Sequence, residues 1–272
     1  MSTFLADGIG GETGDSLCLE IGYIGISAVW YVSSESGTDA SGYGRNREAP
    51  FATIAYAVGA VTEFDTIVVL SDHEETTTSV LTIDKSVLIV GEGSNGGNPT
   101  AVWGTDATGT DAIVDVSADD VEIRNIKFTA PEQAMTAHRI LWGGDDGKLR
   151  GCYFECDEND EDSVVLVEGD HFLAESTTWI SVGTSLATRP YQALSTDASG
   201  LTVFRMIGCV VSGGASGWEA NTGAVYLAQG SGLNVRIEAQ SLLLGADITV
   251  TSGCTGFVSV PTATGGGQVR NI

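Results

Sequence analysis

Acidic residues in short turns are the first candidates for chemistry in this sequence. Five times, an aspartate stands in the polar turn between two apolar segments: Asp84, Asp120, Asp146, Asp170 and Asp197. If these segments stack on one another, the aspartates form a ladder. Clustered carboxylates of this kind either bind Ca²⁺ or act as the acid and base that cleave a glycosidic bond. Asp84, Asp120, Asp146 and Asp170 are therefore the candidate residues for binding an ion or a glycan.

A structural role explains the same aspartates with fewer assumptions. Aspartate tolerates a left-handed backbone and accepts hydrogen bonds from its own chain, so it is common in tight turns. At a strand spacing of about 4.8 Å, two carboxylates in water repel by less than roughly 1 kcal/mol, which exposed turns tolerate. A Ca²⁺ site would need about six to eight oxygen ligands from several turns. We expect a structural ladder, with Ca²⁺ binding as the secondary alternative, and assign no catalytic residue, other metal or cofactor.

The histidines and two of the arginines are the other polar candidates. His73, His138 and His171 stand far apart and show no spacing of a catalytic triad or a metal site. Arg124 and Arg150 occupy strand positions whose apolar neighbours point inward, so both should point outward. On an acidic protein, outward arginines are most simply ion-pair partners.

The cysteines and tryptophans are better explained by packing. The cysteines are Cys18, Cys152, Cys156, Cys209 and Cys254. They form no CxxC pair and no zinc-ligand spacing with histidine, which predicts buried reduced thiols. The tryptophans are Trp30, Trp103, Trp142, Trp179 and Trp218. They could stack on sugars, but three of them fall inside or at the end of strand repeats and could belong to the core.

Apolar segments recur in pairs along the chain and must position these side chains. Within many segments apolar residues alternate, as Val114 with Val116 and Val121 with Ile123, which is the period of a half-buried strand. The pairs return at irregular intervals of about 24 to 36 residues, and the extra residues fall in polar stretches. Irregular loops on a regular core are typical of a solenoid, in which stacked repeats bury a continuous apolar face.

Two all-β architectures could produce this pattern. A sandwich needs antiparallel hairpins, and Asp146-Gly147 is the one pair here suited to a two-residue hairpin between strong strands. A parallel β-helix instead stacks equivalent residues of successive coils. Residues 123–128 align with residues 149–154 in this way, and Cys209 then falls in the row of Cys152. We therefore predict a parallel β-helix.

One short helix is expected near residues 50–61. Phe51, Ile54, Ala55, Val58 and Val61 fall on one helical stripe. The first coil of a solenoid has an exposed core and unpaired strand edges, to which other strands can add. A helix across that end would cover both, so we interpret this segment as a cap rather than a site.

The segment from Tyr31 to Val58, YVSSESGTDASGYGRNREAPFATIAYAV, resembles the entry of the right-handed parallel β-helix proteins of the pectin-lyase-like superfamily. In these proteins a Tyr-Val-Ser strand, a Gly-x-Asp loop and a Pro-Phe-x-Thr-Ile helix lead into the first coil. VEIRNIKFT, residues 121–129, resembles their later coils. The resemblance implies an all-β, right-handed parallel β-helix of about seven coils over residues 30–260. In lyases of this superfamily, an outward Arg or Lys abstracts a proton next to a uronate that Ca²⁺ neutralises. Members of the superfamily found on phage-type particles are commonly trimers.

Charge excludes several classes of partner. The chain of 272 residues carries 36 acidic and 12 basic side chains, a formal net charge of −24. Binding to nucleic acid or to an anionic membrane surface requires clustered Lys and Arg, so neither is expected. The sequence contains no run of eighteen apolar residues, so no membrane span is predicted. Its N-terminus lacks the pattern of a secretory signal. We expect a protein made and kept reduced in the host cytoplasm.

The two terminal segments lack the strand repeat. Residues 1–29 mix glycine with isolated apolar residues, and residues 261–272 begin a glycine-rich tail. Such segments are often ordered only by a partner. The candidate docking residues of the first segment are Phe4, Leu5, Ile9, Leu17, Ile21 and Ile24.

Three functions fit these observations. The first is a non-enzymatic decoration or cement protein on a virion surface, a homotrimer docked on other virion proteins such as the major capsid protein. The second is a tail spike or receptor-binding protein with glycan affinity or depolymerase activity. The third is a free polysaccharide lyase or hydrolase. We rank them in this order, on analogy with the superfamily rather than on specific residues.

Overall fold

The computed structural model describes residues 27–105, 114–129, 138–156, 163–182, 192–196 and 203–212, and the strands within residues 225–227, 234–237, 242–244, 248–250 and 269–271. The candidate docking residues Phe4, Leu5, Ile9, Leu17, Ile21 and Ile24 lie outside the described residues, as does Asp197.

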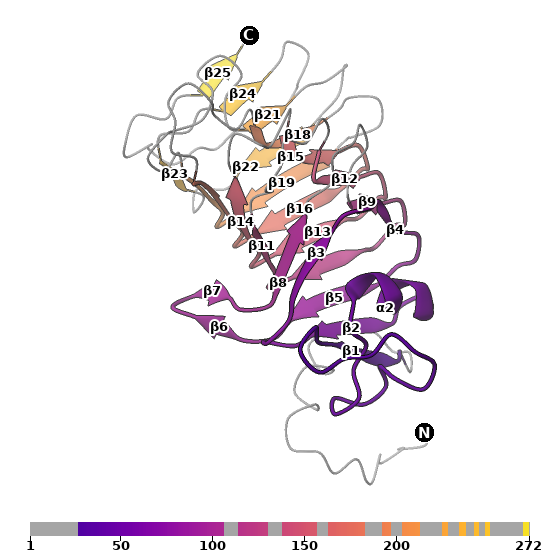
Figure 1. Cartoon of the computed structure of the whole chain (residues 1–272). Helices are drawn as coiled ribbons and strands as arrows, with labels where there is room; N and C mark the ends of the chain where they lie inside the picture. Colours follow the sequence, from indigo (N-terminus) through magenta and orange to yellow (C-terminus); the bar gives the residue numbers. More distant parts are fainter. Residues whose placement is uncertain are drawn as a thin grey trace, which may run out of the picture.

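Three parallel sheets form the body of the molecule (Figure 1). The first sheet contains β1 (Val29–Val32), β2 (Thr66–Val69), β5 (Leu88–Gly91), β10 (Glu122–Arg124), β13 (Lys148–Arg150), β16 (Phe172–Glu175), β19 (Val203–Ile207) and β22 (Asn234–Ile237). The second contains β3 (Glu74–Thr77), β8 (Val102–Thr105), β11 (Lys127–Thr129), β14 (Tyr153–Cys156), β17 (Thr178–Ser181), β20 (Val210–Ser212) and β23 (Leu242–Leu244). The third contains β4 (Leu81–Ile83), β9 (Val114–Val116), β12 (Ile140–Trp142), β15 (Ser163–Val167), β18 (Gln192–Thr196), β21 (Val225–Leu227), β24 (Ile248–Val250) and β25 (Val269–Asn271).

From β2 onward the chain visits the first, second and third sheets in turn and then repeats this circuit. The second sheet has seven strands, one per circuit, so the described strands make seven coils from β2 to β24. Every pair of neighbouring strands in these sheets is parallel, as in the β10–β13 and β11–β14 pairs. The short antiparallel hairpin of β6 (Ser94–Asn95) and β7 (Asn98–Pro99) projects from the second coil (Figure 1). The prediction of an all-β parallel β-helix of about seven coils is confirmed.

The register of the stacked coils agrees with the alignment read from the sequence. Ile123 pairs with Leu149, and Phe128 pairs with Phe154. Tyr153 pairs with Thr178, which in turn pairs with Val210, so Cys152 and Cys209 share a row. One coil lies between these two cysteines.

The sequence pattern missed one strand in each coil. Residues 121–128 read as a single strand but form β10 and β11, separated at Asn125, where φ is +53°. The equivalent positions of later coils are Gly151, Ser176 and Gly208, all with positive φ. A left-handed residue bends the chain sharply from the first sheet to the second, and Asn and Gly adopt this conformation at low cost.

Aromatic rings fill the interior behind the second sheet. Trp103, Phe128, Phe154 and Trp179 are fully buried and stack in sequence, with ring centroids 5.5, 4.5 and 5.5 Å apart. Trp142 is also fully buried and meets Phe172 edge to face. Three of the tryptophans are therefore core residues, so their rings are not available to stack on a sugar.

The buried cysteines behave as small apolar residues. The thiols of Cys152, Cys156 and Cys209 are buried inside the core. Burial raises the pKa of the Cys152 thiol to about 12 and that of Cys209 to about 11. Both remain protonated near neutral pH, as expected for structural thiols.

The predicted helix is present as α2 (Ile54–Ala60) and packs on the N-terminal end of the core (Figure 1). Its buried residues are Ile54, Ala57 and Val58, and the flanking Phe51 and Val61 are buried as well. Ala55 was expected on this stripe but is exposed, because Ala57, three residues after Ile54, faces the core instead.

Polar groups from three segments hold the start of this helix. Thr53 caps it by accepting a hydrogen bond from the Tyr56 amide. A carboxylate oxygen of Asp39 accepts from the Ala52 and Thr53 amides. Glu75, on β3, accepts from the Ile54 amide at 2.7 Å. The cap is thus hydrogen-bonded to the first coil as well as packed on it.

Within the described residues, no helix has the length and apolar character needed to cross a membrane.

Candidate functional site

The acidic turns between the third and first sheets contain the predicted ladder, in a different register. Glu122 pairs with Lys148, 26 residues on, whereas Lys148 pairs with Leu173, only 25 residues on. The aspartates that share a row are therefore Asp119, Asp145 and Asp170. Asp120 and Asp146 form the neighbouring row, which continues with His171.

Asp84 lies outside both of these rows. The pairing of Leu88 with Glu122 places Asp84 in the row of Ala118. Its exposed carboxylate lies 3.2 Å from the ammonium of Lys85. The expected single ladder of Asp84, Asp120, Asp146 and Asp170 is corrected on this point, because coils of unequal length shift the register.

The carboxylates of the observed row bind the backbone of the next coil. Oδ1 of Asp119 accepts a hydrogen bond from the Asp145 amide at 2.9 Å, and Oδ1 of Asp145 accepts from the Asp170 amide at 2.7 Å. Oδ1 of Asp170 then accepts from the Val203 amide at 2.9 Å. Three successive carboxylates thus tie four coils together through amides that the sheets leave unpaired.

The second row meets a conformational requirement. Asp120, Asp146 and His171 each have φ of +56°, the left-handed region in which aspartate is more readily accommodated than most residues. Among the described residues, no group of three or more His, Cys, Asp or Glu side chains has the arrangement of a metal site.

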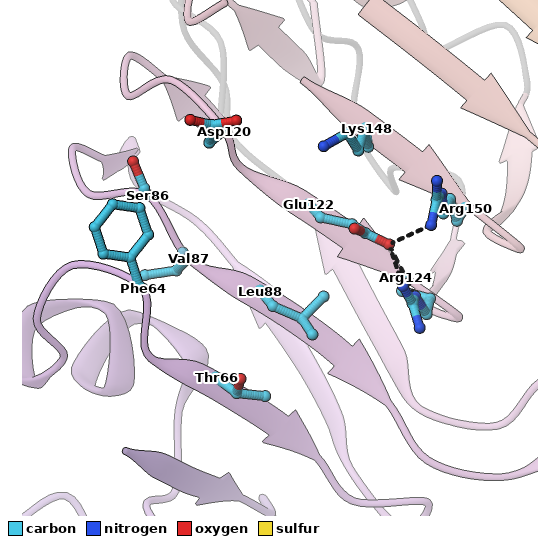
Figure 2. Close-up of a pocket in the computed structure, with 10 residues that line it drawn as sticks. All are labelled: Phe64, Thr66, Ser86, Val87, Leu88, Asp120, Glu122, Arg124, Lys148 and Arg150. Atoms are coloured by element: carbon cyan, nitrogen blue, oxygen red, sulfur yellow. Dashed lines mark hydrogen bonds and ion pairs between the residues drawn. The ribbon is translucent and has the colours of Figure 1, made fainter. Parts of the chain in front are cut away.

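A pocket of about 180 Å³ opens on the outer face of the first sheet, beside these turns (Figure 2). Strands β2, β5, β10 and β13 supply most of its walls. The lining residues are Phe64, Thr66, Ser86, Val87, Leu88, Asp120, Glu122, Arg124, Lys148 and Arg150. Leu88 and Phe64 make one side apolar, whereas the Val87 side chain belongs to the interior core, and charged groups line the other side.

The charged side is organised around the carboxylate of Glu122. Its Oε1 lies 2.6 Å from Nη2 of Arg124 and 3.6 Å from Nη1 of Arg150 (Figure 2). Nε of Arg150 also lies 3.0 Å from Glu175. The two arginines point outward and are ion-paired, as expected from the alternation of the strands.

Lys148 lies beside the ion pairs of Glu122 but is not part of them. It faces Glu122 across the β10–β13 pair and lines the pocket, yet among the described residues its ammonium has no ion pair or hydrogen bond (Figure 2). Sequence reasoning missed Lys148 as a site residue. The available signal was its i, i+2 spacing to Arg150, which sets both side chains on one face of β13.

The histidines do not meet. His73 is buried near α2, where Nδ1 accepts from the Ser34 amide and Nε2 lies 3.2 Å from Glu75. His171 is on a turn several coils away, with Nδ1 3.4 Å from Asp170. His138 lies just before β12. These positions agree with the absence of a triad spacing in the sequence.

Comparison with known proteins adds little to this geometry. No protein-family model matches the chain, and no curated protein matches it. Among solved structures, the crystal structure of the pectin methylesterase from Aspergillus niger is similar, with a TM-score of 0.42 and 16% sequence identity. The match covers 91% of this chain and 86% of that one. The fold assignment rests on the strand pairing described above, which makes the chain a parallel β-helix.

Proposed function

We propose that this chain is a non-enzymatic structural protein of a virion surface, a β-helix displayed as a decoration or cement protein. The observation that carries this proposal is the use of the acidic row. Asp170 is a candidate from the sequence, Asp119 and Asp145 share its row, and each of these three carboxylates accepts a hydrogen bond from the backbone of the following coil. These carboxylates serve as parts of a scaffold.

The capped end and the surface charge support the same role. A solenoid whose first coil is covered by α2 is protected against edge-to-edge aggregation at that end, which suits a protein present in many copies. A formal charge of −24 keeps such copies soluble before assembly and favours basic surfaces as partners.

In this proposal the protein is a homotrimer docked on other virion proteins, such as the major capsid protein. The apolar residues of segment 1–29 are the proposed contact. Neither Ca²⁺ nor another cofactor is required for this role.

Incubation with polysaccharides tests the absence of enzymatic activity. Purified protein is mixed with host capsule polymer and with a pectate-like polymer, with and without Ca²⁺, and chain length is followed by size-exclusion chromatography. We expect unchanged chain lengths in every mixture. Shortened polymer would contradict the non-enzymatic proposal and favour a depolymerase spike or a free lyase or hydrolase.

Glycan binding, the receptor-binding alternative, has one specific observation in its favour. The pocket on the first sheet combines an apolar side with three cationic groups on an otherwise acidic protein. Binding without cleavage in the same mixtures would support this alternative.

A further inference from the structure

The β6–β7 hairpin projects from the second coil, and its tip is open to other molecules (Figure 1). Gly96 and Gly97 have φ of +61° and +93°, the two left-handed residues that close a two-residue hairpin turn. A Cβ on either glycine would meet no atom within 4 Å, so the tip stands clear of the β-helix. Ser94, Asn95 and Asn98 are exposed as well.

Side chains from two other segments hold the base of this hairpin. Arg47, in the entry loop, donates to both carboxylate oxygens of Glu92, at 2.5 and 2.6 Å. Nδ2 of Asn125, on the next coil, donates to the two backbone carbonyls that flank Glu92, at 2.6 and 3.0 Å. A hairpin fixed in this way loses little conformational freedom when its tip meets a partner, so its surface is pre-organised for binding.

The hairpin is uncharged, although the chain is strongly acidic. Residues 93–105 contain no Asp, Glu, Lys, Arg or His, whereas the whole chain carries a formal charge of −24. Extended residues span about 3.3 Å each, so the tip lies roughly 10 Å beyond Gly93. This distance is about one Debye length at physiological salt, which is ~8 Å. The tip can therefore touch a second acidic body while the repulsion between the two bodies is largely screened.

The tip carries hydrogen-bond donors that suit an acidic surface. Among the described residues, Nδ2 of Asn95 and of Asn98 and the amides of Gly96 and Gly97 have no acceptor. The 36 acidic side chains of each copy supply acceptors, and a hydrogen bond from N–H to a carboxylate is stronger than one to a neutral oxygen. The turns between the third and first sheets already join successive coils by bonds of this kind.

We propose that the β6–β7 hairpin docks on carboxylates of a second copy of this chain and is a subunit contact of the homotrimer. The inference rests on the trimer of the proposed function and names the part of the β-helix that joins its subunits. The hairpin is the donor and the acidic body is the acceptor, so the two sides of the contact differ. Each copy gives its hairpin to one neighbour and receives a hairpin from the other, an arrangement that closes into a ring.

Analytical ultracentrifugation of the full-length protein at low and at high NaCl tests this contact. We expect trimers whose dissociation constant falls several-fold at high salt, because salt screens the repulsion between the acidic copies and leaves the amide–carboxylate bonds nearly unchanged. An interface held by ion pairs would weaken instead. Weaker association at high salt, or a monomer at both concentrations, would overturn the proposal. A monomeric protein that is still found on the particle surface would refute the hairpin contact and leave the surface role intact.

Two double variants that add the same charge locate the contact. Asn95→Asp with Asn98→Asp replaces two donors by carboxylates and should weaken trimer association by about tenfold or more, with an unchanged melting temperature. Thr78→Asp with Ser79→Asp, in the exposed loop between β3 and β4, is the matched control and should change association less than about twofold. Equal weakening by both pairs would assign the effect to net charge. Unchanged association in the hairpin variant would assign the trimer to another surface, and either result refutes the proposal.

Discussion

Asp145 illustrates how a side chain with catalytic potential is used for structure in this fold. Its amide donates to Asp119 on one coil, and its carboxylate accepts from the amide of Asp170 on the next. The same carboxylate could ligate a metal or transfer a proton elsewhere, but here it satisfies a backbone donor at a turn. What decides the role of such a residue is its hydrogen-bond partner, which the sequence does not display.

Substitution of Asp145 tests this role. Asp145→Ala removes the acceptor and should lower the free energy of unfolding by about 1–3 kcal/mol, whereas Asp145→Asn keeps an oxygen at this position and should lose clearly less. Asp84→Ala, on an exposed turn outside the row, should stay within about 0.5 kcal/mol. Urea unfolding followed by circular dichroism measures all three. Equal losses for Asp145→Ala and Asp84→Ala would count against the structural ladder.

Asp65 predicts a dependence of stability on pH. Burial raises the pKa of its carboxyl, but hydrogen bonds from Ala28, Trp30 and Thr62 outweigh burial and hold the pKa below its ordinary value of 3.8. Because the folded-state pKa is the lower one, the contribution is fully present above about pH 4–5. It is lost as pH falls through 3.8 toward the folded-state value.

The variant Asp65→Asn isolates this contribution. It should cost about 1–3 kcal/mol at pH 7. The cost should shrink as the pH is lowered below about 4, because the unfolded wild-type chain then binds a proton at Asp65 before the folded state does. Urea unfolding at pH 7, 5 and 3 measures the difference. A cost that is the same at all three values would contradict the assigned hydrogen bonding.

At the scale of secondary-structure elements, neighbouring coils approach so closely that some positions accommodate only glycine without strain. In the turns leading into the first sheet, a Cβ on Gly169 would lie only 1.9 Å from the carbonyl oxygen of Gly144. Gly59, on α2, has open space at the same position. Gly169→Ala should therefore destabilise the protein by about 1–3 kcal/mol, while Gly59→Ala should stabilise it by about 0.5–1 kcal/mol.

Thermal unfolding of these two variants shows whether the change in melting temperature has the opposite sign in each. The melting temperature should fall for Gly169→Ala and rise for Gly59→Ala. A neutral or stabilising Gly169→Ala would mean that neighbouring coils are less tightly stacked at this turn than described.

The aromatic stack is the other element that joins the coils. Phe154 lies between Phe128 and Trp179, at 4.5 and 5.5 Å between ring centroids, and is fully buried. Phe154→Ala should cost about 3–5 kcal/mol, because it leaves a cavity in the middle of the stack. Tyr153→Ala, which truncates the adjacent outward ring, is the control and should cost much less. Urea unfolding compares the two losses, and similar values would argue against a continuous interior stack.

The elements divide into those that the sequence predicts and those that it conceals. The alternation of apolar residues in residues 112–128 and the helical stripe at residues 51–61 both indicate that one face is buried. The strands and the capping helix could therefore be predicted. Asn125 was not recognised as a corner, although the buried positions shift there by one residue, from Val121 and Ile123 to Ile126 and Phe128. The pocket forms because strands 26 residues apart lie side by side, which brings Lys148 next to Glu122. This contact could not be predicted without the register of the two strands.

At the scale of the whole molecule, the described residues form a short solenoid whose N-terminal end is covered by α2. Its coils contact mainly their neighbours, so stability is distributed along the axis rather than gathered at one site. Such a body is suited to display or spacing on a larger surface. The proposed attachment through segment 1–29 predicts that a variant beginning at residue 27 still folds but no longer associates with particles, as sedimentation with purified capsids would measure. Unchanged co-sedimentation would assign the attachment to another part of the chain.

Electron cryomicroscopy of the native particles tests the proposed surface role most directly. The account predicts density for a seven-coil β-helix at many symmetry-related positions on the particle surface, as trimers, with the capped end and the first coil identifiable. Particles that lack this protein, with the chain recovered free in solution, would contradict it.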